Sequence, residues 1–377
     1  MRVGVPRESA EGETRVAGAP DVIKRGERRK IEYLVESGAG AEAHIDDEEF
    51  REAGANVGSA EEAWEAEVVA KVRAPSSEEI ERLSQGQVLI GFLAPLTEPD
   101  TSRALASAGV TAFAMEAIPR ITRAQSADAL SSQATVAGYR AVLIAAEEMG
   151  RFFPMLTTAA GTIKPASVLV LGAGVAGLQA IATARRLGAM VTAYDVRSAV
   201  KEQIESLGAK FLDLELEEDA EAEGGYAKQL AEEQQRRQQE ALAEAAGRFD
   251  AVITTALVPG KPAPKLITEQ AVKNMKPGSV IVDLAAETGG NCELTEAGKT
   301  VLREDVVIAG PLNLPAEMPD HASQLYARNV MSLLELMVGE EGGLELNWED
   351  EVLAGACICR DGEIVHEGAK QAAGVEA

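Results

Sequence analysis

Ser167-Val-Leu-Val-Leu-Gly-Ala-Gly-Val-Ala-Gly177 is the stretch that decides the fold of this 377-residue chain. Its apolar first five residues predict a buried strand, and the glycines that follow have the G-x-G-x-x-G spacing of a tight turn into a helix. The helical pattern continues from Leu178 to Leu187, and a second apolar run ends at Tyr194-Asp195. This order of strand, turn, helix and strand predicts a parallel sheet covered by helices.

Each glycine of the turn has its own steric reason. Gly172 allows the sharp turn, Gly174 has no Cβ and so lets a phosphate approach the backbone, and Gly177 lets the helix lie close to the sheet. The N–H groups at the start of the helix would face the phosphates. Asp195 can accept hydrogen bonds from both hydroxyls of a ribose and would repel a 2′-phosphate. The pattern therefore predicts an NAD(H) site rather than an NADP(H) site, and a βαβ unit without nucleotide is the alternative.

The composition excludes several classes of protein. The formal net charge of −25 disfavours nucleic acid as a partner, because phosphate would be repelled. Three cysteines are too few for a disulfide framework and have no zinc-binding spacing, so we predict no metal site and a cytoplasmic location. No uncharged run approaches the ~20 residues that cross a bilayer, so no direct membrane insertion is expected.

The order of strand and helix patterns predicts an α/β fold with two Rossmann-like parallel-sheet domains and a cleft between them. We expect a discontinuous first domain over residues 1–125 and 315–377, a linking helix over 126–150 and an NAD(H)-binding domain over 151–314.

Two C-terminal segments are expected to belong to the first domain. Val352–Cys359 alternates like a strand, and Glu363–Val365 would pair with it as a hairpin at the edge of the first sheet. The helix predicted over Asp320–Val338 is either a surface for a homodimer or domain core, and we favour core.

A polar loop lies at the predicted domain boundary, where cofactors commonly bind. It holds a cation, an amide and an anion close together, at Arg120, Gln125 and Asp128. The amide can hold a carboxamide, and an Arg120–Asp128 pair can lock the loop. The alternative is a polar cap for the following helix, with Ser126 or Asp128 as the cap.

The segment from Glu215 to Gln239 is strongly polar and for the most part predicts a solvated helix. Its Gly224-Gly-Tyr226 differs, because glycines beside one aromatic residue are typical of a mobile flap over a ligand.

These motifs together resemble the NAD(H)-binding component of proton-translocating nicotinamide nucleotide transhydrogenase, along nearly the whole chain. The resemblance is carried by the Arg120…Gln125…Asp128 loop with Ser131, by Gly224-Gly-Tyr226-Ala-Lys228, and by Val3–Glu8, Glu13–Val16, Val35–Gly40, Lys71–Pro75, Thr254–Pro264 and Lys276–Asp283. The segment Gly310–Pro319 matches that family only loosely.

The resemblance implies a role for each matching residue. The pyrophosphate would lie against Gly172, Gly174, Val175 and Gly177, and the adenosine ribose against Asp195, Val196 and Arg197. The residues that would close over the nucleotide are Gly225, Tyr226, Gln238 and Leu257. Arg120, Gln125, Asp128 and Ser131 would hold the nicotinamide end.

The resemblance also implies partners. The chain has one G-x-G-x-x-G unit, so NADP(H) would be carried by a partner subunit, and a membrane-spanning partner would couple hydride transfer to proton translocation. The chain would then be peripheral to the inner membrane through its partners, and a homodimer is implied.

Alanine dehydrogenase, which would reduce pyruvate with ammonia, is the nearest alternative. Arg15 and Lys71 stand where its substrate residues would, but Gly91-Phe-Leu-Ala-Pro95 contains no histidine, and carbonyl reduction needs a proton donor. Hydride transfer between two nicotinamides needs none. We therefore interpret Arg15 and Lys71 as residues that tie down the N-terminal loop. A third possibility is an NAD-binding regulatory protein without turnover.

Overall fold

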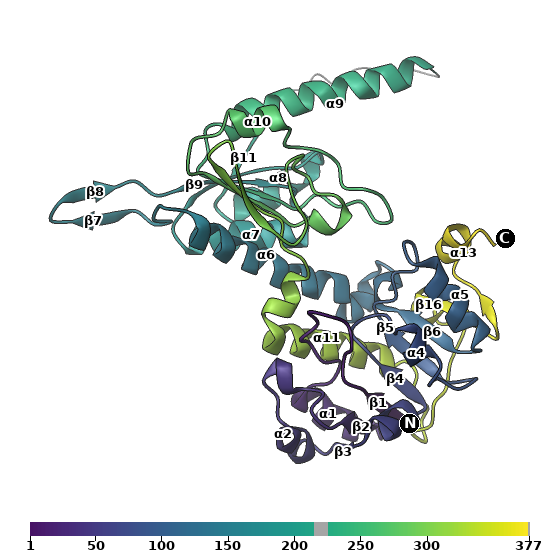
Figure 1. Cartoon of the computed structure of the whole chain (residues 1–377). Coiled ribbons are helices and arrows are strands. Elements are labelled where there is room, and N and C mark those ends of the chain that lie inside the picture. Colours follow the sequence, from purple (N-terminus) through teal and green to yellow (C-terminus); the bar gives the residue numbers. More distant parts are fainter. Residues whose placement is uncertain (215–224, 376–377) are drawn as a thin grey trace. The chain divides into compact units, whose positions relative to one another are not determined.

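The computed structural model describes residues 1–214 and 225–375, apart from the side chains of residues 225–235. The chain divides into two compact units, one formed by Met1–Val136 with Pro315–Ala377 and the other by Ala137–Leu314. Figure 1 shows the elements of both units in chain order. The helix α6 (Ala129–Glu148) contributes residues to both units. Each unit is built on a large, mostly parallel sheet, which confirms the expected α/β class.

The first unit contains an eight-stranded sheet in the order β17-β16-β6-β5-β4-β1-β2-β3. Six of its strands pair in parallel, and β16 and β17 add antiparallel pairs at one edge. The strands are β1 (Arg2–Val5), β2 (Glu32–Glu36), β3 (Asn56–Gly58), β4 (Val68–Ala70), β5 (Val88–Gly91), β6 (Thr111–Ala114), β16 (Cys357–Arg360) and β17 (Glu363–Ile364).

Helices cover both faces of this sheet, because successive side chains of each buried strand point to opposite sides. Val88 and Ile90 belong to one core cluster, whereas Leu89 belongs to the other. The helices of the unit are α1 (Pro20–Glu27), α2 (Asp47–Glu52), α3 (Ala60–Trp64), α4 (Ser77–Ile80), α5 (Pro99–Ser107), α11 (Pro319–Leu334), α12 (Glu351–Ala356) and α13 (Glu367–Ala373). Its 3₁₀ turns are η1 (Ala41–Ala43), η2 (Met115–Ala117), η3 (Thr122–Ala127) and η6 (Leu314–Glu317), the last of which begins at the unit boundary.

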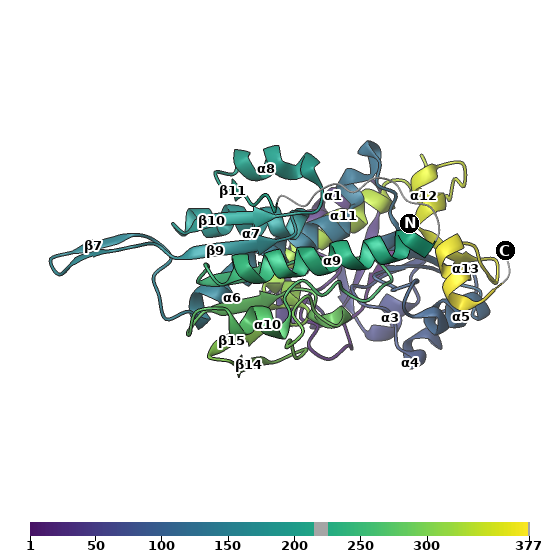
Figure 2. The ribbon, with the colours of Figure 1, turned by 90° about the horizontal axis from the view of Figure 1, so that it is seen from above.

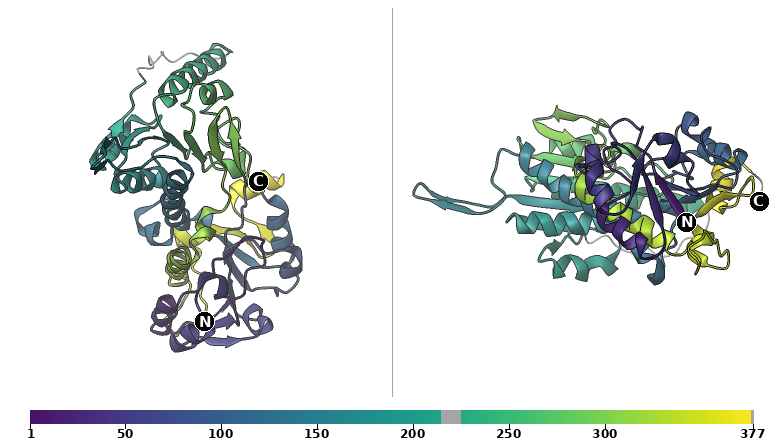
Figure 3. Two further views of the ribbon diagram at one scale, coloured as in Figure 1. Left: turned by 60° about the vertical axis from the view of Figure 1, so that its left-hand side comes forward. Right: turned by 90° about the horizontal axis from the view of Figure 1, so that it is seen from below.

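The helix α11 is core, as favoured from the sequence. It lies beside α1 (Figure 3), and Tyr326, Val330 and Leu334 are buried in the same cluster as the first sheet.

One expectation for the C-terminal region is wrong. The segment predicted as a strand over Val352–Cys359 is helical from Glu351 to Ala356, and the strand begins only at Cys357. The Asp350 side chain accepts hydrogen bonds from the N–H groups of Val352 and Leu353, which starts a helix that the alternating pattern concealed. The hairpin itself is present, since β16 pairs with both β6 and β17.

The second unit contains a seven-stranded sheet in the order β11-β10-β9-β12-β13-β15-β14, with only β14 antiparallel. Its strands are β9 (Ser167–Leu171), β10 (Met190–Tyr194), β11 (Lys210–Phe211), β12 (Ala251–Thr254), β13 (Val280–Asp283), β14 (Thr300–Arg303) and β15 (Val306–Ala309). Besides α6, its helices are α7 (Val175–Arg186), α8 (Lys201–Ser206), α9 (Gly225–Ala246) and α10 (Glu269–Lys273), with 3₁₀ turns η4 (Ser198–Val200) and η5 (Ala286–Thr288).

A separate hairpin of β7 (Leu156–Thr158) and β8 (Gly161–Ile163) was not expected from the sequence. Figures 1 and 2 show it extending away from the seven-stranded sheet. Its residues are mostly exposed, so no buried face produced the alternation that sequence analysis needs.

Candidate functional site

The glycine turn has the geometry that its sequence predicts. Gly172 has a φ of 100°, which favours glycine, and a Cβ on Gly177 would lie 1.9 Å from the carbonyl oxygen of Gly172. A Cβ on Gly174 would meet no atom within 4 Å, so the turn is open at that position. Gly172 and Gly177 are therefore required by the protein itself, whereas none of the described residues requires Gly174 to lack a side chain.

Gly174 is also the N-cap of α7. Its position has no side-chain cap, so the first N–H groups of α7 and its positive dipole end are available to an anion. The turn lies after β9, at the point where the strand order reverses between β9 and β12. Ligands of open parallel sheets bind at such a point.

Asp195 is buried beside this turn. Its Oδ2 accepts a hydrogen bond from the N–H of Ala173 at 2.7 Å, and its Oδ1 accepts one from the N–H of Arg197 at 2.9 Å. The Arg197 guanidinium also contacts both carboxylate oxygens, at 3.0 and 3.1 Å. Burial alone would raise the pKa of Asp195, but these hydrogen bonds outweigh it and hold the pKa below its usual value. The Asp195 carboxylate is therefore ionised and held in one orientation. It is paired with the exposed Arg197 side chain, which a bound ribose would have to displace.

Exposed apolar side chains flank the turn. Val196 and Leu257 follow the ends of β10 and β12 and are 75% and 55% exposed, and Val175 at the start of α7 is also exposed. Large apolar side chains exposed together at a strand-end cluster are typical of a ligand site.

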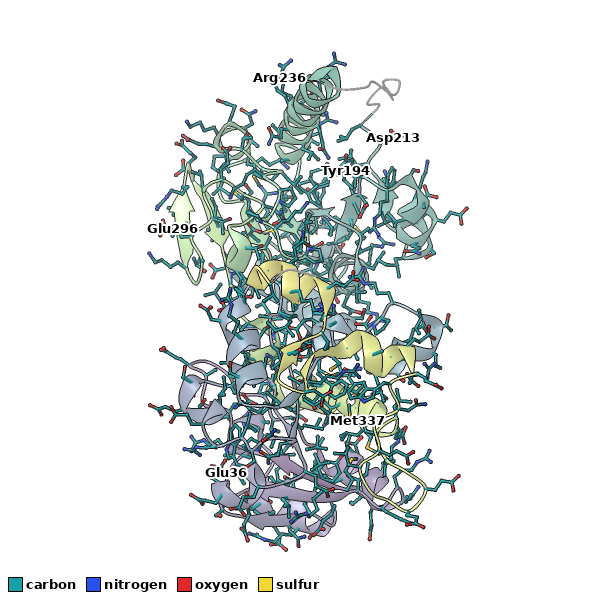
Figure 4. All side chains as sticks on the ribbon, turned by 90° about the vertical axis from the view of Figure 1, so that its right-hand side faces the viewer. Glu36, Tyr194, Asp213, Arg236, Glu296 and Met337 are labelled. Atoms are coloured by element: carbon teal, nitrogen blue, oxygen red, sulfur yellow. The ribbon has the colours of Figure 1, made fainter. Side chains whose placement is uncertain are left out.

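The helix α9 contributes one of the expected residues. Gln238 donates a hydrogen bond from Nε2 to the hydroxyl of Tyr194, at 2.9 Å. Figure 4 shows Tyr194 below the helix from which Arg236 projects. The backbone of Gly225 and Tyr226 lies in the first turn of α9, whereas the Tyr226 side chain, and Gly224 altogether, lie outside the described residues.

Two residues that the sequence did not single out hold the loops around the turn. Thr255 donates from Oγ1 to the carbonyl oxygens of Leu171 and Gly172, at 3.3 and 3.2 Å. The buried Asn291 bonds the N–H and the carbonyl of Ala256, at 3.0 and 2.8 Å. A small hydroxyl residue directly after a strand is too common in sequences to mark such a role.

The polar loop of the first unit is ordered differently from the expectation. Asp128 does not pair with Arg120: its carboxylate accepts hydrogen bonds from the N–H and the hydroxyl of Ser131, at 2.9 and 2.6 Å, and so caps α6. The arginine that forms an ion pair is Arg123, which contacts Asp350. Asp128 stands three residues before Ser131, so its carboxylate reaches the free N–H groups of the helix more easily than it reaches the Arg120 guanidinium. The capping alternative is therefore the one observed.

Arg120 and Gln125 point away from the core. Both are exposed, and within the part of the chain that the structure describes Arg120 has no hydrogen-bond or ion-pair partner. The loop thus presents the exposed Arg120 guanidinium and the exposed Gln125 amide, close in sequence to Asp128, which caps α6. These groups can donate hydrogen bonds to carbonyl and phosphate oxygens of a ligand.

The loop's start is fixed by Glu116. The Glu116 carboxylate accepts hydrogen bonds from the N–H groups of Leu93 and Ala94, which follow β5. Burial raises the pKa of Glu116 despite these hydrogen bonds. No histidine stands directly after β5, where the N–H groups of Leu93 and Ala94 bind this carboxylate.

Arg15 and Lys71 are buried and already paired. Arg15 contacts both carboxylate oxygens of Glu13, at 2.7 and 2.6 Å. The ammonium of Lys71 lies 3.3 Å from Glu8 and 3.0 Å from Glu79. These contacts tie down the loop that follows β1, as expected from the sequence, and a substrate carboxylate would have to displace them.

The histidines serve structural or surface positions. His366 caps α13 by accepting a hydrogen bond from the N–H of Ala369, at 3.2 Å, and burial lowers its pKa. His44 ends η1 in the left-handed conformation, and His321 lies in the first turn of α11.

The chain matches two family models over almost its whole length. Residues 4–137 match the N-terminal domain of alanine dehydrogenase/PNT, and residues 141–367 match its C-terminal domain. The fold, the glycine turn and these matches define one class: the chain belongs to the alanine dehydrogenase/PNT family.

Within that family, the most similar relatives compared have transhydrogenase names. The chain is 49% identical to the first portion of the NAD(P) transhydrogenase alpha subunit of Rhodospirillum rubrum, over 97% of this chain and 98% of that protein. It is 48% identical to NAD(P) transhydrogenase subunit alpha of Haemophilus influenzae, over 96% of this chain and 71% of that protein. The alanine dehydrogenase of Mycolicibacterium smegmatis is 30% identical, over 97% of this chain and 95% of that protein.

Solved structures rank in the same order. The structure of a transhydrogenase from Sinorhizobium meliloti has a TM-score of 0.86 at 45% identity, covering 97% of this chain and 99% of that chain. An L-alanine dehydrogenase structure has a TM-score of 0.82 at 26% identity, covering 99% of both chains. The resemblance stated from the sequence is confirmed.

Proposed function

We propose that this chain is the NAD(H)-binding subunit of an NAD(P) transhydrogenase and takes part in direct hydride transfer between NAD(H) and NADP(H). Its most similar compared relatives are named as alpha subunits of that enzyme. The observation that carries the proposal is the glycine turn, where an open Cα at Gly174, the uncapped start of α7 and the ionised Asp195 lie together. These are the groups that a pyrophosphate and a ribose require.

Each group of residues has a defined task in this proposal. Gly172, Gly174, Val175 and Gly177 accommodate the pyrophosphate. Asp195, Val196 and Arg197 bind the adenosine ribose, with Arg197 turning away from the carboxylate. Gly225, Tyr226, Gln238 and Leu257 close over the nucleotide. Arg120, Gln125, Asp128 and Ser131 hold the nicotinamide end, where Arg120 and Gln125 have exposed donors.

The proposed reaction asks little acid–base chemistry of the protein. Bound NADH would supply a hydride from its nicotinamide ring to the ring of NADP⁺, with the reverse transfer equally possible. The two rings must approach to about 3–3.5 Å with aligned faces, so the protein's task is to position and to exclude water. The loop of residues 116–132 suits this task, because Glu116 and Asp128 fix its two ends by hydrogen bonds.

The second nucleotide and the proton path belong to partners. We propose that NADP(H) is carried on a partner subunit, and that a membrane-spanning partner couples transfer to proton translocation. In the described residues, no helix of this chain is long and apolar enough to cross a bilayer. A cytoplasmic, membrane-peripheral position and a homodimer are included in the same proposal.

Reductive amination of pyruvate, the alternative considered from the sequence, is less well supported. The arginine and lysine that it needs are buried in ion pairs with Glu13, Glu8 and Glu79. The residues after β5 include no histidine, and their N–H groups bind Glu116.

One experiment tests both functions. The chain is mixed with a purified NADP(H)-binding transhydrogenase domain, and reduction of acetylpyridine adenine dinucleotide by NADPH is followed by absorbance. The expected result is turnover that requires both proteins. A parallel assay with pyruvate, ammonia and NADH should show none; oxidation of NADH in that assay without the partner would refute the proposal. NADH binding without turnover under either condition would instead support a regulatory role.

A further inference from the structure

The proposed nicotinamide loop has a few apolar anchors: Ile118 is buried in the core of the first unit, and Ile121 packs against that core. Its 3₁₀ segment η3 buries the methyl groups of Ala124 and Ala127, each 2% exposed, which lie on one face because residues i and i+3 eclipse in a 3₁₀ helix. Gln125, between them, points outward. These apolar contacts hold the loop backbone against the core, and polar contacts add a constraint on its orientation.

Besides the hydrogen bond that Asn329 donates to the carbonyl oxygen of Ser126, at 2.9 Å, Arg123 supplies a polar contact in the middle of the loop. Its two terminal nitrogens lie 2.7 and 2.9 Å from the two carboxylate oxygens of Asp350, and one of them lies 3.7 Å from a carboxylate oxygen of Glu351. This is a fork-to-fork pair, which fixes orientation as well as distance. The pair joins residues separated by 227 positions in the chain.

The acceptor of this pair is itself held in place. Asp350 caps α12 by accepting hydrogen bonds from Val352 and Leu353, and its side chain is 17% exposed. Hydrogen bonding from Arg123 lowers the pKa of Asp350, so the acceptor is ionised at neutral pH.

The segment around α12 that carries the acceptor is packed against its neighbours. Trp348 stacks on Phe113 of β6, with ring centroids 6.1 Å apart, and the Arg360 guanidinium lies 4.2 Å from the Trp348 ring. The helix also lies directly against the start of the loop, since a Cβ on Gly355 would be 2.6 Å from Pro119.

We propose that the Arg123–Asp350 pair is a positioning device for the transhydrogenase reaction. Arg123 lies three residues after Arg120 and two before Gln125, so fixing its side chain to α12 limits where both exposed groups can be presented. The inference rests on the proposed function, and Arg123 is a positioning residue that need not contact nucleotide.

A second pair in the same unit provides a matched control. Arg25 contacts both oxygens of Glu335, at 3.1 and 2.6 Å, and its side chain is 51% exposed against 19% for Glu335, which also pairs with Arg29 at 3.3 Å. Arg123 is 47% exposed, and its aspartate partner is covered to about the same degree as Glu335. The control pair joins α1 to the end of α11 and not to the loop.

The test compares Arg123→Gln, Asp350→Asn and their double variant with Arg25→Gln. The Asp350→Asn change keeps a side-chain oxygen for the α12 cap. Each protein is mixed with the NADP(H)-binding domain and assayed for reduction of acetylpyridine adenine dinucleotide, and NADH affinity and Tm are measured separately. We expect kcat to fall about three- to tenfold in both single variants and no further in the double variant, because small misplacements near a reacting ring are costly. In the single variants, the Kd for NADH should stay within about twofold of the unmodified value, and Tm should match that of Arg25→Gln. Arg123→Lys should have a higher kcat than Arg123→Gln, because a lysine keeps one contact with Asp350.

Several results would overturn the inference. A kcat equal to that of Arg25→Gln, or losses that add in the double variant, would show that the pair does not position the loop. A fall in Tm with unchanged kcat per folded protein would make the pair structural only. Absence of turnover in the unmodified chain with its partner would instead refute the proposed function, and the positioning role with it.

Discussion

The turn can contain glycine for two reasons: close packing within the protein, or close approach of a phosphate to the backbone. Replacing Gly174 by alanine distinguishes these reasons. Among the residues that the structure describes, a methyl group at this position meets no atom within 4 Å, and the backbone φ of −76° is available to alanine. The folded protein therefore has no steric reason to resist the change. If a pyrophosphate lies against this Cα, however, the methyl group occupies its place.

The magnitudes follow from these distances. Stability should change by no more than about 0.5 kcal/mol, because alanine is a poorer N-cap than glycine but adds no clash. NADH affinity should fall at least about tenfold, which corresponds to about 1.4 kcal/mol. Gly177→Ala should instead destabilise the folded protein, because its Cβ would lie 1.9 Å from the carbonyl oxygen of Gly172. Overpacking of this kind costs about 1–3 kcal/mol and should lower Tm by several degrees.

The assay is a fluorescence titration with NADH alongside thermal unfolding. Gly150→Ala is the control, because that exposed glycine also has open space around it and lies away from the turn. An NADH Kd for Gly174→Ala equal to that of Gly150→Ala would show that the pyrophosphate does not approach the turn at this point. The assignment of the glycine turn as the nucleotide site would then fail.

Three further variants test other parts of the molecule. Asp195→Asn should reduce the preference for NADH over NADPH, measured as a ratio of Kd values, since a 2′-phosphate would no longer meet a carboxylate; an unchanged ratio would remove the ribose assignment. Gln125→Asn should slow hydride transfer with the partner while leaving NADH Kd almost unchanged; a collapse of binding would show that its role is structural. Burial would raise the pKa of Asp250, but hydrogen bonds from Ser167 and Lys276 hold this pKa below its usual value. The ionised carboxylate therefore stabilises the fold at pH values above the ordinary aspartate pKa of about 3.9. That stability is lost as pH falls through the lower pKa of the folded state. Unfolding monitored between pH 6 and about pH 2 should therefore show a smaller acid loss in Asp250→Asn, and an identical pH profile would contradict this.

The sequence by itself determined the strand–turn–helix unit that we propose as the nucleotide site. The strand Ser167–Leu171, the glycine spacing and the position of Asp195 are linked by short-range sterics: a turn that needs positive φ at Gly172 and close packing at Gly177 restricts the residue types within one βαβ unit. The same locality made Asp128 a recognisable alternative as a helix cap.

Tertiary structure alone decided which charged groups pair and how the C-terminal segment folds. The sequence suggested Arg120 as the partner of Asp128, yet Asp128 caps α6, Arg123 binds Asp350 and Arg120 remains exposed. Val352–Ala356 alternates like a strand but is a helix, because the Asp350 cap and packing against Pro119 outweigh the local pattern. The physical reason is range: backbone sterics and helix caps act between near neighbours, whereas an ion pair across 227 residues depends on a topology that brings the last strands beside β6.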